Sequence, residues 1–568
     1  CSKPKPLSRR QSLGVANRTL KDAGGATLGT WKYAPSLRAE GGFWVEAKRV
    51  AMTPLGDRSE NYFSVSPLDT GNGYWVREYG LPFVRSKSDG GSACLNGTCL
   101  STKTFDCPFS NQDPTDDTGC TEMRTTELTY EQDETTVGIA DAAESNRRIL
   151  AERTIFKDDA SHFAAVSRNV YDGVGHYRTD NLSGNFGAGD TRTNKVFWKG
   201  GRPAITEPWL LLDFDAKEQA ENGVTERQEF VMNDKGTVDC ERRLKTGASR
   251  GANDLIVTYS RDANGQVTTE SSYGGDFQPL TSTAANCVGL SNPEFTTTHV
   301  YSSGVRSRSY RTQGGLQLNS LDLTIDPRTG FASSSRDVAG VATNFTYDTS
   351  GRPLTVSPSG DAVTTYDYNV TAAQPHLQMI LGPLGTPLEQ ERWDLDGLGR
   401  VFRHRLRLPN GNWAYQRFGF DDAGNKNFES VRAASASVAI GTIFDGFDPF
   451  GRAATVQAPD GKNVTFLYMG TRIAQRTATV WNGASEISWT TTEETDRQGR
   501  LFKVTEPNGT VTRYSYDAGS RLSQVCQNLT GGCGQTRTFA YDGRGLLTSE
   551  GHPEVASTTY QYNSLGQV

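Results

Sequence analysis

Polar and apolar residues alternate along short segments in the second half of the chain. After Gly461, the segment "KNVTFLY" places Val464, Phe466 and Tyr468 at every second position, and "TVTRYSY" after Gly509 repeats the pattern. A period of two puts these side chains on one face of an extended strand. Thr, Val, Tyr and Phe are also the residues that favour pleated structure, so the pattern predicts a series of β-strands.

Two kinds of tight turn separate the expected strands. In the first kind, an Asp that can accept a backbone N–H precedes by three residues a Gly that can take a positive φ. These pairs are Asp172 with Gly175, Asp262 with Gly265, Asp348 with Gly351, Asp396 with Gly399, Asp448 with Gly451, Asp496 with Gly499, and Asp542 with Gly545. Asp517 departs from the spacing, because its nearest glycine is Gly519. In the second kind, a proline precedes a glycine by two residues, as in Pro358 with Gly360, Pro409 with Gly411, Pro459 with Gly461, and Pro507 with Gly509.

The first kind of turn recurs at a nearly fixed period. From Asp348 through the aspartates at 396, 421, 448, 496, 517 and 542 to Asn563, successive gaps are 48, 25, 27, 48, 21, 25 and 21 residues. These gaps indicate one unit of 21 to 27 residues, with two units skipped or degenerate. Looser copies surround Asp172 and Asp262, so a repeat architecture is expected from about residue 160 onward.

The repeated phrase resembles the unit of the YD-repeat, or Rhs, family. Tyr347-Asp348 with Gly351-Arg352 shows the full pattern, and the related residues are Asp448 with Gly451-Arg452, Tyr541 with Asp542 and Gly545, Tyr516 with Asp517, Arg400 and Arg500. The match is clear from about residue 340 to 568 and weaker from about 160 to 340. Family members, which include teneurin shells and subunits of insecticidal toxin complexes, wind the repeats into a sheet that spirals around a hollow interior.

We therefore expect an all-β fold in which tandem antiparallel hairpins spiral into a hollow, shell-like sheet. Many bacterial relatives enclose a C-terminal toxin that autoproteolysis releases, but this sequence stops within a repeat at "YQYNSLGQV". The resemblance thus implies an incomplete shell in a partial chain. Four parts are expected: residues 1–40 as a tether or irregular segment, 41–160 as a β-rich, cysteine-containing start of the shell, 161–340 as degenerate repeats, and 341–568 as clear repeats.

Eight internal cysteines favour disulfides and an oxidising compartment. They are Cys94, Cys99, Cys107, Cys120, Cys240, Cys287, Cys526 and Cys533. They can form four bridges, and joining Cys526 to Cys533 needs the least chain closure, although the sequence leaves the pairing open. Zinc is the alternative for the first four, but neither a CxxC pair nor a nearby histidine accompanies them.

Cys1 begins a segment, "CSKPKPLSRR", that looks like the start of a mature bacterial lipoprotein. In that case Cys1 carries lipid and provides the sole contact with a membrane. The alternative is that the sequence begins there as a fragment. The expected location is extracellular or on the bacterial cell surface, with anchoring in the outer membrane if Cys1 is lipidated.

Charge and motifs weigh against nucleic-acid binding and catalysis. The formal net charge is -6, and the 59 basic residues are scattered among 65 acidic ones without a long basic run. The six histidines lie outside any HExxH motif, and GxSxG and GKS motifs are missing, so we expect no enzyme, no metal and no cofactor. Asp394 and Asp396 resemble the start of a calcium-binding EF-hand loop, but a turn explains them as well.

The leading hypothesis is a non-enzymatic, structural part of an exported Rhs protein. Its shell would encapsulate or present a toxin or another polypeptide that this chain does not contain. An adhesion or carbohydrate-binding module that contacts glycans or cell-surface proteins is the alternative, and a hydrolase is the third hypothesis. Four aromatic residues have two alternative roles, stacking on sugar rings or packing across strands: Trp393, Trp413, Tyr415 and Trp481.

Overall fold

The computed structural model consists of strands and turns, and none of its described residues is helical. It describes residues 16–21, 27–40, 43–52, 54, 58–69, 74–82, 99–106, 119–131, 148–172, 175–187, 190–199, 213–281, 287–313, 316–371, 374–470, 472–481, 483–528 and 532–568.

The strands follow one another with short connections. The first nineteen are β1 (Asn17–Lys21), β2 (Thr27–Glu40), β3 (Phe43–Met52), β4 (Arg58–Asp69), β5 (Tyr74–Pro82), β6 (Cys99–Asp106), β7 (Thr121–Glu131), β8 (Arg148–Phe156), β9 (His162–Tyr171), β10 (Tyr177–Gly184), β11 (Arg192–Trp198), β12 (Phe214–Glu221), β13 (Val224–Met232), β14 (Val238–Arg243), β15 (Leu255–Arg261), β16 (Val267–Gly274), β17 (Phe295–Ser302), β18 (Val305–Gln313) and β19 (Leu316–Ile325). The others are β20 (Ala332–Arg336), β21 (Ala342–Tyr347), β22 (Pro353–Pro358), β23 (Thr364–Asn369), β24 (His376–Leu381), β25 (Glu389–Leu395), β26 (Val401–Arg407), β27 (Trp413–Phe420), β28 (Lys426–Ser430), β29 (Gly441–Phe447), β30 (Ala453–Gln457), β31 (Asn463–Met469), β32 (Ile473–Trp481), β33 (Glu486–Thr495), β34 (Leu501–Thr505), β35 (Val511–Tyr516), β36 (Leu522–Gln527), β37 (Gln535–Tyr541), β38 (Leu547–His552) and β39 (Val555–Thr559).

Nearly every strand pairs antiparallel with the next one along the chain. The exception is at β4, which pairs with β5 along one part of its length and with β6 along another. Pairing continues from β8 to β9 and from β20 to β21, so the four parts expected from the sequence belong to one sheet. Within residues 1–40, expected as a tether or irregular segment, Asn17–Lys21 and Thr27–Glu40 form β1 and β2. Gly29 and Pro35 suggest a turn there, but β3 pairs along most of β2 and holds it extended.

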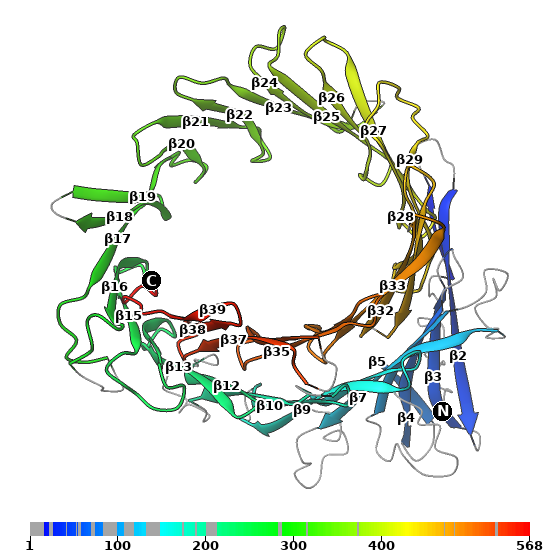
Figure 1. The fold of residues 1–568 in the computed structure, drawn as a ribbon, viewed down its shortest axis with the longest axis horizontal. Helices are drawn as coiled ribbons and strands as arrows, with labels where there is room; N and C mark the ends of the chain where they lie inside the picture. The colour runs from blue at the N-terminus through cyan, green and yellow to red at the C-terminus, as the bar shows by residue number, and fades with distance from the viewer. Residues whose placement is uncertain are drawn as a thin grey trace, which may run out of the picture.

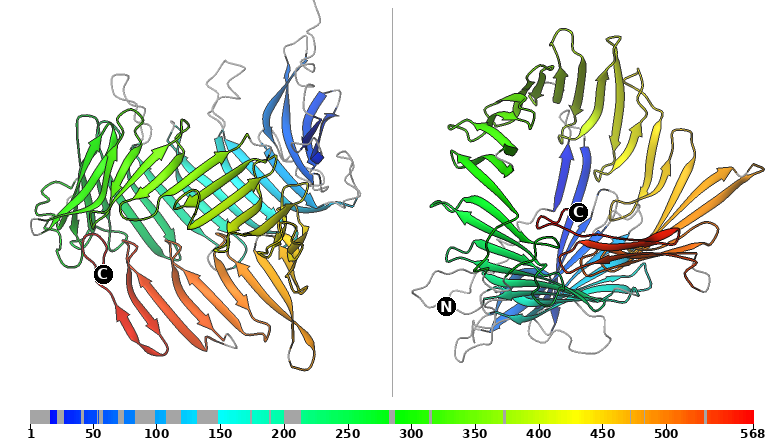
Figure 2. Two further views of the ribbon diagram at one scale, coloured as in Figure 1. Left: turned by 90° about the horizontal axis from the view of Figure 1, so that it is seen from above. Right: turned by 60° about the vertical axis from the view of Figure 1, so that its left-hand side comes forward.

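The sheet winds as a spiral that does not close on itself. In Figure 1 the chain runs clockwise around a central space that no described strand crosses, and β33–β39 return beside strands of the first turn. Figure 2 shows this second turn below the first. The all-β spiral of antiparallel hairpins that the sequence predicted is therefore confirmed.

The two kinds of turn lie on opposite edges of the spiral, because successive strands run in opposite directions. Asp-type corners follow odd-numbered strands such as β21, β25, β29, β33 and β37, and we call this edge the Asp edge. The corner of Asp337 and Gly340, which follows β20, is an exception on the opposite edge. Corners of the Pro-Gly type follow even-numbered strands, namely β22, β26, β30 and β34, and lie on the opposite edge.

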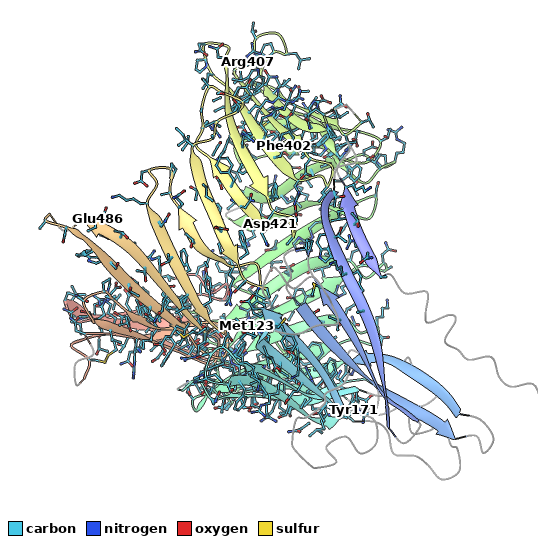
Figure 3. The ribbon with its side chains drawn as sticks, turned by 90° about the vertical axis from the view of Figure 1, so that its right-hand side faces the viewer. Met123, Tyr171, Phe402, Arg407, Asp421 and Glu486 are labelled. Atoms are coloured by element: carbon cyan, nitrogen blue, oxygen red, sulfur yellow. A yellow bond between two sulfur atoms is a disulfide. The ribbon has the colours of Figure 1, made fainter. Side chains whose placement is uncertain are left out.

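The Asp edge of the second turn packs against the opposite edge of the first turn. The N–H of Gly543 donates to the carbonyl of Lys245 over 2.6 Å, and the N–H of Asp276 donates to the carbonyl of Tyr562 over 2.7 Å. Figure 3 shows Met123 near this junction and Glu486 at the free tip of the second turn. We call the junction the seam.

Strand chirality shows which face of the sheet lines the interior. Consider a strand of L-residues viewed with its chain direction pointing up. A residue whose backbone N–H and C=O point to the right then has its side chain directed toward the viewer. The carbonyl of Ala342 accepts from Ser359, so it points toward β22. Figure 2 (left) shows β20–β27 from outside, running left to right with the Asp edge uppermost. Ala342 and Thr346 therefore face outward, whereas Phe345 and Tyr347 face the interior.

The cross-strand register extends this assignment around the wall. Val464, Phe466 and Tyr468 share the inner face, and Thr465 and Leu467 share the outer face. The inner face is thus rich in aromatic residues, as the alternation in the sequence predicted for one face of each strand.

The wall has little core of its own. Among the described residues, most side chains are half-buried or exposed, and few are buried. Several of the most buried side chains lie beside the seam, among them Leu244, Ile256 and Ala518. Burial is therefore concentrated where one turn meets the next.

Candidate functional site: the seam between the turns

Each Asp-type corner is held by one carboxylate. Oδ1 of Asp348 accepts the N–H groups of Ser350 and Arg352 over 2.8 and 2.9 Å, and Oδ2 accepts from Nε of Arg352 over 2.7 Å. The backbone N–H of Arg352 is the largest of the influences that lower the pKa of Asp348. Gly351 supplies the positive φ of +81°. The same three bonds recur at the corners of Asp396, Asp448 and Asp496.

The arginines of five corners each stack on an aromatic ring at or near the end of a later odd-numbered strand. The guanidinium of Arg352 lies 4.5 Å from the ring centre of Tyr368, and that of Arg500 lies 4.7 Å from Tyr516. Further pairs are Arg400 with Phe420, Arg452 with Tyr468, and Arg521 with Tyr541. Each contact contributes about 0.5–2 kcal/mol, so the Tyr-Asp-Gly-Arg phrase builds a ladder along the Asp edge.

The corner of Asp517 closes without glycine in the usual place. Ser520 takes the position three residues after the aspartate, with a φ of +62°, and its N–H donates to the carbonyl of Asp517. Its hydroxyl accepts from Nη2 of Arg192 in the first turn over 2.7 Å. A seam contact thus accompanies the unfavourable backbone conformation.

Glu221, at the end of β12, is the centre of one ionic cluster in the seam. Its side chain is fully buried and accepts from Nε and Nη2 of Arg192 over 2.8 and 2.6 Å. From the second turn, Nη2 of Arg500 donates over 2.7 Å, and Nε of Arg500 also bonds Asp496 over 2.6 Å. Burial opposes ionisation of Glu221, but the hydrogen bonds from Arg500 and Arg192 outweigh it and lower the pKa.

Asp276 is the centre of a second cluster. It accepts from Nζ of Lys245 over 2.6 Å, from the N–H of Tyr562 over 3.0 Å and from Nη2 of Arg544 over 3.1 Å. Arg544 is itself buried and also pairs with Asp542. Burial raises the pKa of Asp276, but the bonds from Lys245, Arg544 and Tyr562 lower it well below its usual range.

Two more ion pairs cross the seam. Nε of Arg472 donates to Oδ2 of Asp159 over 2.9 Å, and the neighbouring N–H of Gly470 donates to Asp158 over 2.8 Å. Arg521 pairs with Glu226. The seam carboxylates therefore serve as charged acceptors for arginines of the facing turn, an arrangement that joins the turns.

Two of the sequence-predicted Asp corners lie on the free edge of the first turn. Asp172 binds the N–H of His176 over 3.0 Å and its Nδ1 over 2.8 Å, and the imidazole stacks on Trp198 at 3.9 Å. His176 thus occupies the arginine position of the repeat, beside Gly175 with a φ of +126°. The carbonyl of Asp262 accepts from the N–H of Gly265, which has a φ of +82°.

Two disulfides have both partners in the described residues, Cys240 with Cys287 and Cys526 with Cys533. Cys120 is disulfide-bonded as well. Cys99 begins β6, but its side chain lies outside the described part, as do Cys1, Cys94 and Cys107.

The resemblance of Asp394 and Asp396 to a calcium loop has another explanation in the structure. Asp396 caps its corner by accepting the N–H groups of Leu398 and Arg400. Asp394 is bonded by arginine side chains. In the described parts, no three or more His, Cys, Asp or Glu side chains gather as a metal site would require.

The candidate sugar-binding aromatics do not share one surface. Trp393 is on the inner face and stacks on His404 at 5.2 Å. Trp413 and Tyr415 are on the outer face, opposite Arg407 and Arg405. The side chain of the fourth, Trp481, lies outside the described part.

Sequence reasoning missed the first-turn partners in the seam. Glu221, Glu226, Asp276 and Arg192 belong to no repeated phrase, and their partners are more than 260 residues away in the chain. Only the number of strands in a turn brings them together.

A family model matches the segment that holds two of these corners. The RHS Repeat model matches residues 496–525, which hold the corners of Asp496 and Asp517, so the resemblance drawn from the sequence is confirmed there. No curated protein matches the chain.

Two solved structures are similar at low identity. The crystal structure of TcdB2-TccC3-TEV matches with 11% identity over 94% of this chain and 40% of that chain, at a TM-score of 0.43. A Photorhabdus luminescens Tc holotoxin pore with a mutated TccC3 matches with 12% identity over 95% of this chain and 33% of that chain, also at 0.43. The chain therefore spans well under half of the length of either.

The described residues include no helix with the length and apolarity needed to span a membrane.

Proposed function

We propose that this chain, which carries an RHS repeat at residues 496–525, is a wall section of an exported β-shell. The shell encloses another polypeptide that lies outside this chain, and the wall itself has no catalytic role. The observation that carries the proposal is a wall without a filled core. Few of the described side chains are buried, and the strands encircle a central space.

The seam suits a container, because its bonds join successive turns of the wall. Glu221 and Asp276 each engage cationic side chains from both turns. Buried ion pairs are costly to break singly, which favours one fixed pitch of the spiral. A wall of this kind keeps a constant shape around its contents.

The inner face suits contact with a polypeptide. Aromatic side chains such as Phe466, Tyr514 and Trp489 line it, and Trp489 is half exposed. Aromatic side chains offer apolar area to an unfolded or partly folded chain. The disulfides support export, because such bonds persist in oxidising compartments.

Cysteine accessibility tests whether the interior is occupied. Thr491→Cys places a thiol on the inner face of β33, and the neighbouring Thr490→Cys, on the outer face, is the matched control. Each variant is labelled with a maleimide, as this chain and within the intact gene product, and the introduced site is read by mass spectrometry. We expect residue 491 to be protected only in the intact product, whereas residue 490 is labelled in both. Equal labelling of residue 491 in both forms would contradict an enclosed polypeptide.

A further inference from the structure

The outer face of β25–β27 carries a dense group of arginines. Antiparallel register places five arginines and one aspartate on this face: Arg392, Asp394, Arg403, Arg405, Arg407 and Arg417. Figure 3 labels Arg407 at one end of β26 and Phe402 near the other. We call these six residues the arginine patch. Its formal charge is +4, five arginines against one aspartate, in a chain whose net charge is -6.

One buried carboxylate serves three of the arginines. Asp394 is fully buried and accepts from Nε of Arg392 over 2.8 Å and from Nε of both Arg403 and Arg405 over 2.6 Å. Burial opposes ionisation, but the bonds from Arg392, Arg403 and Arg405 lower the pKa of Asp394. One negative charge is therefore shared by three positive ones.

Arginines also lie directly opposite one another across the strands. Arg392 pairs in register with Arg405, and Arg403 with Arg417. Like charges at opposed positions destabilise a sheet, and the single negative charge of Asp394 offsets the four positive charges only in part. The four side chains are neither fully buried nor fully exposed, which leaves them within reach of a ligand.

The patch has hydrogen-bond donors to spare. A guanidinium has five N–H donors, and Arg403 donates one of them, from Nε, to Asp394. Arg407 donates from Nη1 to Gln390 over 3.0 Å, and Arg417 donates from Nη1 to the carbonyl of Val438 over a long 3.4 Å. Planar guanidinium groups bind carboxylates through two parallel bonds, so the patch is suited to carboxylate ligands.

We propose that the arginine patch binds an acidic polypeptide segment on the outside of the wall. Alternate residues of β26 are about 6.6–6.8 Å apart, and neighbouring strands are about 4.8 Å apart, so the guanidinium groups form a grid. An extended peptide presents alternate carboxylates at the same spacing as alternate residues of β26. Tyr415 and Trp413, opposite Arg405 and Arg407, add flat surface beside the charges. The inference goes beyond the enclosing role, because an external surface binds its partner whether or not the interior is filled.

The test uses arginines that do not hold Asp394. The double variant Arg407→Gln with Arg417→Gln removes two charges and leaves all three bonds to the buried carboxylate. The matched control is Arg336→Gln with Arg513→Gln, which removes two exposed arginines of the outer face elsewhere on the sheet. Circular dichroism establishes that both double variants keep their β-structure.

Binding of a fluorescein-labelled oligoglutamate peptide is measured by fluorescence anisotropy with the full chain. We expect the patch variant to bind about tenfold more weakly than the unaltered chain, which corresponds to about 1.4 kcal/mol, and the control to bind unchanged. Equally weakened peptide binding in the patch variant and in the control would mean that the peptide responds to the overall charge of the chain and not to the patch, and would overturn the proposal. Tighter binding of single-stranded DNA than of the peptide would replace the partner by nucleic acid. Full displacement of the peptide by an equal concentration of inorganic phosphate would reduce the patch to a small-anion site.

Discussion

Replacing Glu221 by glutamine removes one charge from the seam and preserves the shape of the side chain. Glu221 is fully buried, and its partners Arg192 and Arg500 are 9% and 10% exposed, so the cluster behaves as a buried ion pair. Removing one partner of such a pair costs about 3–5 kcal/mol, because the remaining charges stay buried without compensation. Arg500 keeps Asp496, whereas the described side-chain bonds of Arg192 then reach no carboxylate.

Hydrogen exchange at the neighbouring Asp517 corner measures the lost stability locally. A local measurement is needed because a long repeat protein does not unfold as one unit. The corner amides of Asp517 and Ser520 lie beside the cluster. A loss of about 3–5 kcal/mol, at tenfold per 1.4 kcal/mol, is expected to speed the exchange of these amides about 100- to 4000-fold in Glu221→Gln. The control is Glu218→Gln, also on β12, whose partners Lys195 and Arg227 are 41% and 25% exposed, so each of its two ion pairs contributes at most about 1 kcal/mol. Equal effects of the two variants would refute the view that the seam holds the turns together.

Three further predictions concern two turn glycines, one disulfide and one seam carboxylate. Gly247→Ala is expected to disrupt folding, because the added Cβ would lie within 2 Å of a backbone oxygen. In the control Gly399→Ala the added Cβ meets no neighbouring atom, so only the positive φ opposes the substitution, at a cost of about 1–2 kcal/mol. Thermal melts compare the two variants. Reducing the Cys240–Cys287 bridge, which closes 47 residues, should cost about 4 kcal/mol, and a melt of Cys240→Ser against the oxidised chain measures this. Asp276 has a lowered pKa when folded, so its contribution is complete above its unfolded pKa of about 3.9 and is lost as the pH falls through the folded pKa. Acid titration followed by exchange of the Asp276 amide should show protection falling below about pH 4, and Asp276→Asn should flatten that dependence.

Local chemistry made the corners predictable. Asp348 and Gly351 form a turn through bonds within four residues, so the sequence carries the whole signal. The same holds for alternation along β31, where Phe466 and Tyr468 share a face. Ser520 was missed because a serine rarely takes a positive φ, although its place three residues after an aspartate was a usable signal.

The seam was beyond prediction because it depends on how many strands complete one turn. Glu221 and Arg500 meet across 279 residues, and small changes in twist at each strand would shift that pairing. The arginine patch was only partly predictable from the sequence. The segment "RVFRHRLR" alternates visibly, but only the register with β25 and β27 places Arg403 beside Arg417 and around Asp394.

Solution X-ray scattering tests the hollow wall most directly. A compact protein of this length has a radius of gyration of about 24 Å. A thin wall around an interior is expected to give a clearly larger radius of gyration and a pair-distance distribution skewed toward long distances. A radius near about 24 Å with the profile of a filled globule would contradict it.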